Sequence, residues 1–361
     1  MPAADISARV LTAPRTLETQ QFARPELSEH DALLEVAATG LCGSDLASYL
    51  GEKKHGGPVI LGHEVVGRIA EIGSAAAQLW GVGAGDRVAV EEAIPCMSCP
   101  LCRSGDQRLC ARSGIRYGYT SVGTAPSLWG GFAQYMYLHP RTQLHPVPDS
   151  VSDELATLYI PLSNGLAWMR DAADVRPGER VAVFGPGQHG LASALAAQRL
   201  GAAEVVVVGT GQDSGRLALA RELGCHTVTA GTEDVERGVL AALGGNPDVV
   251  LDMTPRSAQP VEAGIRLAAP RGRVLWGGMK RGAAQPLVDT DLVVQKELTV
   301  RGLWGRSSWA VPAAFAWLAA DPRPARLCER TYGLGELDRA FGDALGEGRD
   351  PAALHAAVTV N

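Results

Sequence analysis

The stretch Val181-Ala-Val-Phe-Gly-Pro-Gly-Gln-His-Gly190 joins an apolar, β-branched run to a segment whose apolar residues have helical spacing. In such a strand-turn-helix unit, the first glycine of G-x-G-x-x-G permits a tight turn, the second lets the backbone approach a pyrophosphate, and the third lets helix and strand pack closely. The phosphate meets the positive end of the helix. The motif predicts a dinucleotide site at Gly185, Gly187, Gln188, His189 and Gly190. We expect the His189 side chain to be solvated and not a ligand.

The same alternation extends along the chain from this motif. Strand-like runs occupy 181–184, 205–208, 249–252 and 274–276, and helix-like segments occupy 189–200, 215–223 and 258–267. A β-α-β-α order predicts a parallel sheet covered by helices on both faces. The preceding part of the chain instead predicts a compact, partly closed β domain. Its short apolar runs, separated by Gly, Pro and Asp, are 8–13, 32–39, 65–72, 87–90 and 132–138.

The end of the second strand in the alternating region bears on which dinucleotide fits. A carboxylate there would accept hydrogen bonds from the adenosine ribose hydroxyls of NAD, but the chain has Val208-Gly-Thr-Gly211. Gly209 and Thr210 tolerate a 2′-phosphate better than a carboxylate would, and Arg216 is close enough in sequence to contact it. The alternative is that Arg216 lies on a solvated helix face. We expect NAD(P), with a preference for NADP.

A four-cysteine loop, Cys96-Met-Ser-Cys-Pro-Leu-Cys-Arg-Ser-Gly-Asp-Gln-Arg-Leu-Cys110, stands in the β-rich part. The C-x2-C-x2-C-x7-C spacing lets Cys96, Cys99, Cys102 and Cys110 aim their thiolates at one point, as a tetrahedral Zn2+ site requires. The loop has few apolar residues, so a bound metal would contribute directly to its folding. A disulfide cluster or unrelated free thiols are the alternatives, and a reducing compartment disfavours the disulfides.

Two shorter segments of the β-rich part carry further metal-ligand types. Gly40-Leu-Cys-Gly-Ser-Asp45 offers the Cys42 thiol, and Gly62-His-Glu64 offers an imidazole and a carboxylate, all of which Zn2+ accepts. Single Cys and His residues are more often structural than ligating. The residues alone therefore leave both interpretations open.

Composition and charge exclude several classes of protein. The 361 residues allow two domains, and 46% hydrophobic with 20% charged residues are typical of a globular protein. A net charge of −6 without a basic run argues against a nucleic-acid partner. The first residues do not form a signal peptide and no apolar run is long enough to span a bilayer, so we expect a cytoplasmic protein without a membrane partner.

Five motifs, taken in order, resemble the zinc-dependent medium-chain dehydrogenase/reductase superfamily, and within it the threonine and sorbitol dehydrogenase-like branch of the alcohol dehydrogenases. They are G-L-C-G-S-D, G-H-E, the four-cysteine loop, Gly130-Gly-Phe-Ala-Gln-Tyr135 and G-x-G-x-x-G. The resemblance covers essentially the whole chain. It implies an α/β protein in which a GroES-like, β-rich catalytic domain at 1–156 and 298–361 is split by a Rossmann domain, a doubly wound parallel sheet at 157–297.

The resemblance also implies roles for the site residues. The four-cysteine loop would hold a structural zinc, and a catalytic zinc would lie near Cys42 and His63. Ser44 would relay the proton of the substrate hydroxyl. Asp45 would hold the His63 ring on the side away from the metal.

One position departs from the family pattern. The family's E-P-L segment supplies a Glu ligand to the catalytic zinc, but this chain has Ile160 there, and Ile160 cannot bind a metal. Glu64 directly follows His63 and could complete the site as a third ligand. His355, on a C-terminal strand, would pair with Glu64 or leave it free to bind. An empty or water-filled site is the alternative outcome.

The function expected on this basis is reversible hydride transfer between an alcohol carbon and the nicotinamide C4 of NAD(P), assisted by zinc, on a polyol, amino alcohol or secondary alcohol. A reductase of an activated C=C or iminium bond without catalytic zinc is a second hypothesis. A catalytically idle dinucleotide-binding or zinc-binding protein is a third. Segments 273–277 and 287–294 match those by which the family pairs its sheets edge to edge, so a homodimer or homotetramer is expected.

Overall fold

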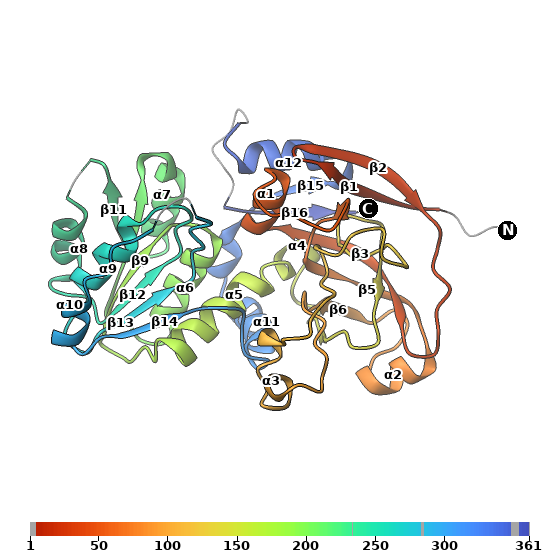
Figure 1. Cartoon of the computed structure of the whole chain (residues 1–361), viewed down its shortest axis with the longest axis horizontal. Coiled ribbons are helices and arrows are strands. Elements are labelled where there is room, and N and C mark those ends of the chain that lie inside the picture. The colour runs from red at the N-terminus through yellow and green to blue at the C-terminus, as the bar shows by residue number, and fades with distance from the viewer. Residues whose placement is uncertain (1–4, 233, 283–284, 348–353, 361) are drawn as a thin grey trace. The chain divides into compact units, whose positions relative to one another are not determined.

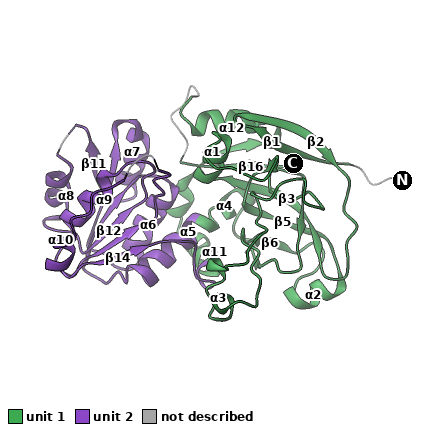
Figure 2. Ribbon diagram, in the orientation of Figure 1, with its two compact units in different colours: residues 1–160, 311–361 green, residues 161–310 purple. Residues whose placement is uncertain are grey.

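The structure is a computed structural model that describes residues 5–232, 234–282, 285–347 and 354–360. The chain divides into two compact units, residues 1–160 with 311–361 and residues 161–310 (Figure 1, Figure 2). The boundaries expected from the sequence were 156/157 and 297/298. The second unit extends further at its C-terminal end, because strand β14 (Thr299–Gly302) pairs with β13 (Arg273–Trp276) in the same sheet. Among the described residues, no helix combines the length and the apolar character needed to cross a membrane.

The first unit is built on two sheets of mainly antiparallel strands. One sheet has the order β2-β1-β4, and the other has the order β15-β16-β3-β5-β6-β8, with β7 paired to β3. Alternate apolar side chains of these strands fill the core. The strand bounds are β1 Ile6–Ala13, β2 Thr16–Phe22, β3 Ala32–Leu41, β4 Val59–Ile60, β5 Glu64–Ile72, β6 Arg87–Val90, β7 Tyr135–Leu138, β8 Leu144–Pro146, β15 Cys328–Gly333 and β16 His355–Thr359.

The helices of the first unit are short and lie between its strands. They are α1 Gly43–Tyr49, α2 Ser74–Trp80, α3 Pro100–Arg103, α4 Asp153–Ala156, α11 Ala310–Ala320 and α12 Leu337–Ala344, and α5 Tyr159–Ala167 contains the boundary between the units. The register of β3 with β5 is what positions the site. Gly40 lies opposite Glu64, and on the other side of β3, Leu41 lies opposite Ala356 of β16. The end of β3 and the starts of β5 and β16 therefore lie side by side, at the same end of these three strands.

The second unit is a parallel sheet of six strands in the order β11-β10-β9-β12-β13-β14. Its central strands are nearly continuous apolar runs, as expected for a sheet with both faces covered. The strand order reverses direction between β9 and β12, and ligands of such folds bind outside the carboxyl ends of the strands at this point. The remaining bounds are β9 Arg180–Phe184, α6 Gln188–Arg199, β10 Glu204–Thr210, α7 Ser214–Glu222, β11 His226–Ala230, α8 Val235–Leu243, β12 Val249–Asp252, α9 Gln259–Leu267 and α10 Thr290–Gln295.

The four-cysteine loop forms a small lobe of the first unit. Cys99 is the N-cap of α3, Cys102 lies within this helix, and Cys110 follows a short 3-10 turn. The sulfur atoms of Cys99 and Cys102 are 3.5 Å apart, and those of Cys96 and Cys102 are 3.9 Å apart. Zn–S bonds of about 2.3 Å in a regular tetrahedron place the sulfur atoms about 3.8 Å apart. The spacing therefore fits one Zn2+ ion.

The apolar side chains of this lobe do not form a core. Met97, Leu101 and Leu109 are all exposed. The sulfur atoms instead take part in the internal contacts of the lobe, and the backbone N–H of Cys96 donates to the sulfur of Cys110 at 3.2 Å. Four neighbouring thiolates repel one another unless a cation lies between them. A bound metal would therefore contribute to the order of the lobe.

Replacing Cys99 with Ser removes one of the four thiolates and should release the zinc of this lobe. We expect one zinc fewer per chain by elemental analysis and a fall of roughly 10 °C in the melting temperature, since the metal contributes folding energy. Cys225→Ser is the matched control, because Cys225 is a buried thiol of the second unit. If Cys99→Ser keeps both its zinc and its melting temperature, the site is wrongly assigned.

Candidate catalytic metal centre and dinucleotide site

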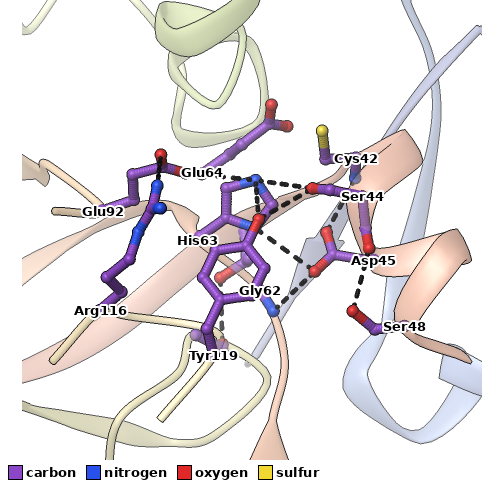
Figure 3. Close-up of polar contacts among 12 residues, drawn as sticks. Cys42, Ser44, Asp45, Ser48, Gly62, His63, Glu64, Glu92, Arg116 and Tyr119 are labelled. Atoms are coloured by element: carbon purple, nitrogen blue, oxygen red, sulfur yellow. Dashed lines mark hydrogen bonds and ion pairs between the residues drawn. The ribbon is translucent and has the colours of Figure 1, made fainter. Parts of the chain in front are cut away.

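Three possible metal ligands converge where β3 ends and β5 begins (Figure 3). They are the Cys42 thiol, the His63 imidazole and the Glu64 carboxylate. One possible ligand atom of each lies within 4.8 Å of the others, and all three residues are buried. The sheet register explains this, because Cys42 comes just after β3 and His63 just before β5. A thiolate, an imidazole and a carboxylate match the three protein ligands that a catalytic Zn2+ ordinarily keeps.

Asp45 orients both the His63 ring and the loop that carries Cys42. Its side chain is fully buried in the first turn of α1, and one oxygen, Oδ2, accepts the backbone N–H of Cys42 at 3.0 Å. The other oxygen, Oδ1, lies 3.3 Å from Nδ1 of His63 and accepts the N–H of Gly62 at 3.3 Å. Because Nδ1 faces Asp45, Nε2 is the nitrogen left to bind a metal.

Glu64 contacts a histidine from the C-terminal strand β16. Its Oε2 lies 3.7 Å from Nδ1 of His355, and both side chains are fully buried. Nε2 of His355 is hydrogen-bonded to the hydroxyl of Thr157 at 2.8 Å. Gly40 leaves room for the pair, since a Cβ there would lie 2.3 Å from Oε2 of Glu64. The structure thus places His355 beside Glu64. A carboxylate oxygen of Glu64 also lies within 4.8 Å of ligand atoms of Cys42 and His63.

The electrostatics of this group favour a bound cation. Burial and the Glu64 carboxylate raise the pKa of the Cys42 thiol. Burial lowers the pKa of His63, but Tyr119 and Asp45 raise it by more, so the net shift is well upward. In the absence of a metal, the thiol and the imidazole therefore hold their protons. A divalent cation displaces these protons and offsets the charges of Cys42 and Glu64, so the donor set fits Zn2+.

The Ser44 hydroxyl lies on the Nε2 side of His63. Its Oγ is 3.4 Å from Nε2 and 2.9 Å from the hydroxyl of Tyr119 (Figure 3). Burial raises the pKa of Tyr119 far above its usual value, so the phenol keeps its proton at neutral pH. Ser44 and Tyr119 therefore form a pair of neutral hydroxyls beside the metal ligands.

Three residues of this site were not selected from the sequence, namely Tyr119, Glu92 and Arg116. The Tyr119 hydroxyl is 3.5 Å from Nε2 of His63, and Oε2 of Glu92 is 3.8 Å from the same nitrogen. Arg116 forms an ion pair with the other Glu92 oxygen. These residues lie in loops and belong to no motif. The one available signal was the position of Glu92 two residues after a strand, where functional side chains often occur.

Ile160 supplies no ligand to the metal group. It is 3% exposed and belongs to an apolar cluster of the first unit that includes Val66 and Phe315. The neighbouring Tyr159 hydroxyl donates to the carbonyl of Val90 and lies 3.4 Å from the carbonyl of His63. The segment that carries a ligand in the family therefore buttresses the site here through packing and a backbone hydrogen bond.

The glycine-rich loop of the second unit has the geometry that its motif predicts. Gly185 has φ of +97°, a conformation that residues with a Cβ rarely adopt. A Cβ at Gly190 would lie 2.0 Å from the carbonyl oxygen of Gly185, so helix α6 and strand β9 pack closely only with glycine there. Gly187 is the N-cap of α6 and faces open space. Backbone N–H groups at the start of α6 are thus accessible to a pyrophosphate.

The His189 side chain is only partly exposed and packs against protein, in contrast to the solvated loop residue expected from the sequence. Its ring stacks on Trp168 with centroids 5.5 Å apart, and its Nε2 lies 2.9 Å from Nδ2 of Asn164. Both partners come from the segment that precedes β9, a contact that periodicity could not reveal. Gln188 is also buried, at 6% exposed. These two side chains hold the first turn of α6 in place from the protein side.

At the end of β10, the structure adds a carboxylate that the sequence reasoning missed. A Cβ at Gly209 would lie 2.9 Å from Pro186 and 3.1 Å from the Cβ of Asp213. Thr210 donates its N–H and its hydroxyl to Oδ2 of Asp213 at 2.9 and 2.8 Å. Nη1 of Arg216 lies 3.5 Å from the other Asp213 oxygen. The ion pair with Asp213 therefore holds Arg216 near the end of β10.

Comparisons with known proteins agree with this organisation. The family described as alcohol dehydrogenase GroES-like domain matches residues 28–149, and the family described as zinc-binding dehydrogenase matches residues 190–320. The protein named "Probable alcohol dehydrogenase adh" from Mycobacterium tuberculosis is 41% identical over 341 residues, 92% of this chain and 93% of its own. "Probable D-xylulose reductase A" from Aspergillus fumigatus is 32% identical over 296 residues, 77% of this chain and 76% of its own.

A solved structure extends the likeness over the whole chain. A Sinorhizobium meliloti 1021 protein bound to NADP aligns with a TM-score of 0.84 and 26% identity, covering 99% of both chains. The GroES-like and Rossmann-type organisation expected from the five motifs is thus confirmed, and so is the zinc-binding, NAD(P)-dependent character of the enzyme. The chain belongs to the zinc-containing medium-chain dehydrogenase/reductase family of alcohol dehydrogenases.

Proposed function

We propose that this enzyme interconverts an alcohol and a carbonyl compound by hydride transfer with NAD(P), using a catalytic zinc held by Cys42, His63 and Glu64. The observation that carries the proposal is the buried convergence of these three ligand types. Bound there, Zn2+ supplies a Lewis acid that lowers the pKa of a substrate hydroxyl, and NAD(P) supplies the hydride acceptor. The residues of the chain bind and orient the substrate and move its proton.

Ser44 is the residue that we assign to the proton. Its Oγ lies 3.4 Å from Nε2 of His63, next to the ligand positions, and 2.9 Å from the Tyr119 hydroxyl. A substrate hydroxyl beside the metal ligands can therefore donate to Ser44, and Tyr119 orients the Ser44 hydroxyl for this role. Asp45 keeps Nε2 directed toward the same side by its contact with Nδ1.

The substrate class that we propose is a small, polar alcohol: a polyol, an amino alcohol or a secondary alcohol. Glu92, Arg116 and Tyr119 place charged and hydrogen-bonding groups beside His63. Such groups suit a substrate with more than one polar substituent, because they can form hydrogen bonds with those substituents. The similarity to a D-xylulose reductase of Aspergillus fumigatus supports a polyol in particular.

A second candidate function follows from Ile160. Without a ligand from this position, a site that holds no zinc would suit the reduction of an activated C=C or iminium bond, where hydride delivery requires orientation but no stabilised alkoxide. The number of zinc ions separates the two functions. Two per chain support the alcohol dehydrogenase, whereas one per chain favours the zinc-free reductase.

For the cofactor, we propose that NADP(H) binds at least as tightly as NAD(H). Gly209 carries no acid, and Arg216 lies near the end of β10. A cation at this position can meet a 2′-phosphate. The relative of known structure that binds NADP supports this choice.

We also propose that the enzyme works in the cytoplasm without nucleic-acid partners. None of its seven cysteines forms a disulfide, as suits a reducing compartment. Two thiolate-containing metal sites likewise require reduced cysteines. The net charge of −6 does not favour contact with phosphate backbones.

Ser44→Ala should lower kcat/KM by about 10²-fold to 10³-fold while leaving the zinc content at two per chain, since only proton transfer is removed. Nicotinamide absorbance measures the rate and elemental analysis counts the metal. Ser44→Thr keeps a hydroxyl at this position and should restore most of the activity. Full activity in Ser44→Ala would mean that the proton leaves by another route.

Glu64→Gln should weaken binding of the catalytic zinc by roughly 10-fold to 100-fold, whereas Ile160→Glu should strengthen it by adding a fourth protein ligand. Titration with a metal chelator, followed by zinc counting, measures both effects. The zinc of the four-cysteine lobe stays in place and is the internal reference. If Glu64→Gln keeps its second zinc as firmly as the wild type, Glu64 is not a ligand.

Segment 273–277, expected to form the pairing edge, is internal here, because β13 lies between β12 and β14. We therefore propose that the enzyme assembles as a homodimer or homotetramer through the β14 edge of the second unit. β14 ends the sheet order, and Leu287 and Val294 nearby in sequence are 84% and 76% exposed. An uncovered strand edge with exposed apolar neighbours favours pairing with a second copy. Light scattering at micromolar concentration should show at least a dimer, and Val294→Asp should shift it toward monomers. A wild-type monomer under these conditions would remove the proposal.

A further inference from the structure

We propose that Asp213 sets the relative affinity of the enzyme for NAD(H) and NADP(H), as the acid that position 209 lacks. In this proposal Asp213 and Arg216 act in opposite directions on the adenosine ribose. The inference rests on the proposed function only in requiring that the second unit binds a nicotinamide dinucleotide. It needs no knowledge of the substrate.

Two hydrogen bonds from Thr210 and close packing against Gly209 hold Asp213 at the end of β10. Its Cβ lies 3.1 Å from where a side chain would begin at Gly209. The same point is 2.9 Å from Pro186, which stands inside the G-x-G turn of the glycine-rich loop. Two hydrogen bonds from Thr210, at 2.9 and 2.8 Å, hold one carboxylate oxygen at the end of β10. The carboxylate thus reaches the strand end, where folds of this class bind the adenosine ribose.

The chemistry of the carboxylate matches a ribose with free hydroxyls. A carboxylate offers about four acceptor positions; Thr210 occupies two of them, and Nη1 of Arg216, at 3.5 Å, takes a third. The remaining position suits a ribose hydroxyl of NAD(H), which is a donor. A 2′-phosphate presents only acceptors and carries negative charge, so Asp213 repels it.

Arg216 has the opposite preference. Its Nη1 lies 3.5 Å from Oδ1 of Asp213, and the two side chains are 26% and 21% exposed. The guanidinium suits a phosphate because it presents several donors in a fixed fork. In the free enzyme, Asp213 offsets part of the Arg216 charge, and this lowers the attraction of the site for NADP(H). The two residues therefore form one charge pair whose balance determines cofactor choice.

A purely local role is the alternative, because the hydrogen bonds from Thr210 also stabilise the turn between β10 and α7. Asp213→Asn separates the two roles. Asparagine keeps an oxygen that can accept from Thr210, but it loses the negative charge. Asp213→Ser is a second variant that also keeps an acceptor, in case the amide packs poorly. A thermal scan checks that each variant is folded.

The experiment measures dissociation constants of NADH and NADPH by nicotinamide fluorescence on the zinc-loaded enzyme, without substrate. Asp213→Asn should lower the ratio Kd(NADPH)/Kd(NADH) by about tenfold, from loss of one charge near the phosphate. Arg216→Ala should raise the same ratio. Asp234→Asn is the matched control, because it removes the same charge elsewhere in the unit. Asp234 caps α8 by accepting from the N–H of Arg237 at 3.1 Å. Its ratio should equal that of the wild type.

Two results would overturn the inference. If Asp213→Asn and Asp213→Ser change both affinities equally or not at all, Asp213 only stabilises the turn. If they raise the ratio, as Arg216→Ala does, Asp213 serves to position Arg216 for the phosphate. A wild-type enzyme that binds neither dinucleotide would contradict the proposed function itself, and this outcome is distinct from an unchanged ratio in an enzyme that binds both.

Discussion

The fully buried carboxylate of Glu64 constrains how the first unit is built. Removing a charge from water costs several kcal/mol unless partners compensate for it, and here the partners come from distant parts of the chain. His355 approaches from β16 and His63 from the start of β5, and Gly40 leaves space for the carboxylate. A divalent cation bound there would offset the charges of Glu64 and Cys42 together.

The two-unit fold could be predicted from the sequence because its strongest signals are local. Apolar runs mark the central strands of the second unit, and their bounds agree with the structure within one or two residues. β11 was missed because three of the five residues of His226-Thr-Val-Thr-Ala230 are polar and the strand is partly exposed at the sheet edge. An edge strand buries little apolar surface, so periodicity carries little information about it.

The candidate site could be predicted only as far as its motifs extend. Cys42, His63 and Glu64 lie next to glycines in recognisable segments, and strand register then brings them together. The neighbours Glu92 and Tyr119 come from loops whose path depends on tertiary packing. Single-residue propensities say nothing about such contacts, which is also why the stacking of His189 on Trp168 could not be foreseen.

The place of β16 in its sheet has a consequence for how the chain matures. β16 lies between β15 and β3, so it completes a sheet whose other strands, β15 apart, are made roughly 200 to 300 residues earlier. Ribosomes add about 5–20 residues per second, so the edge of β3 waits many seconds for its neighbour. The second unit is contiguous and can fold during this interval. Cys42, His63 and Glu64 are therefore synthesised early but meet His355 last, which exposes the nascent enzyme to mispairing at β3.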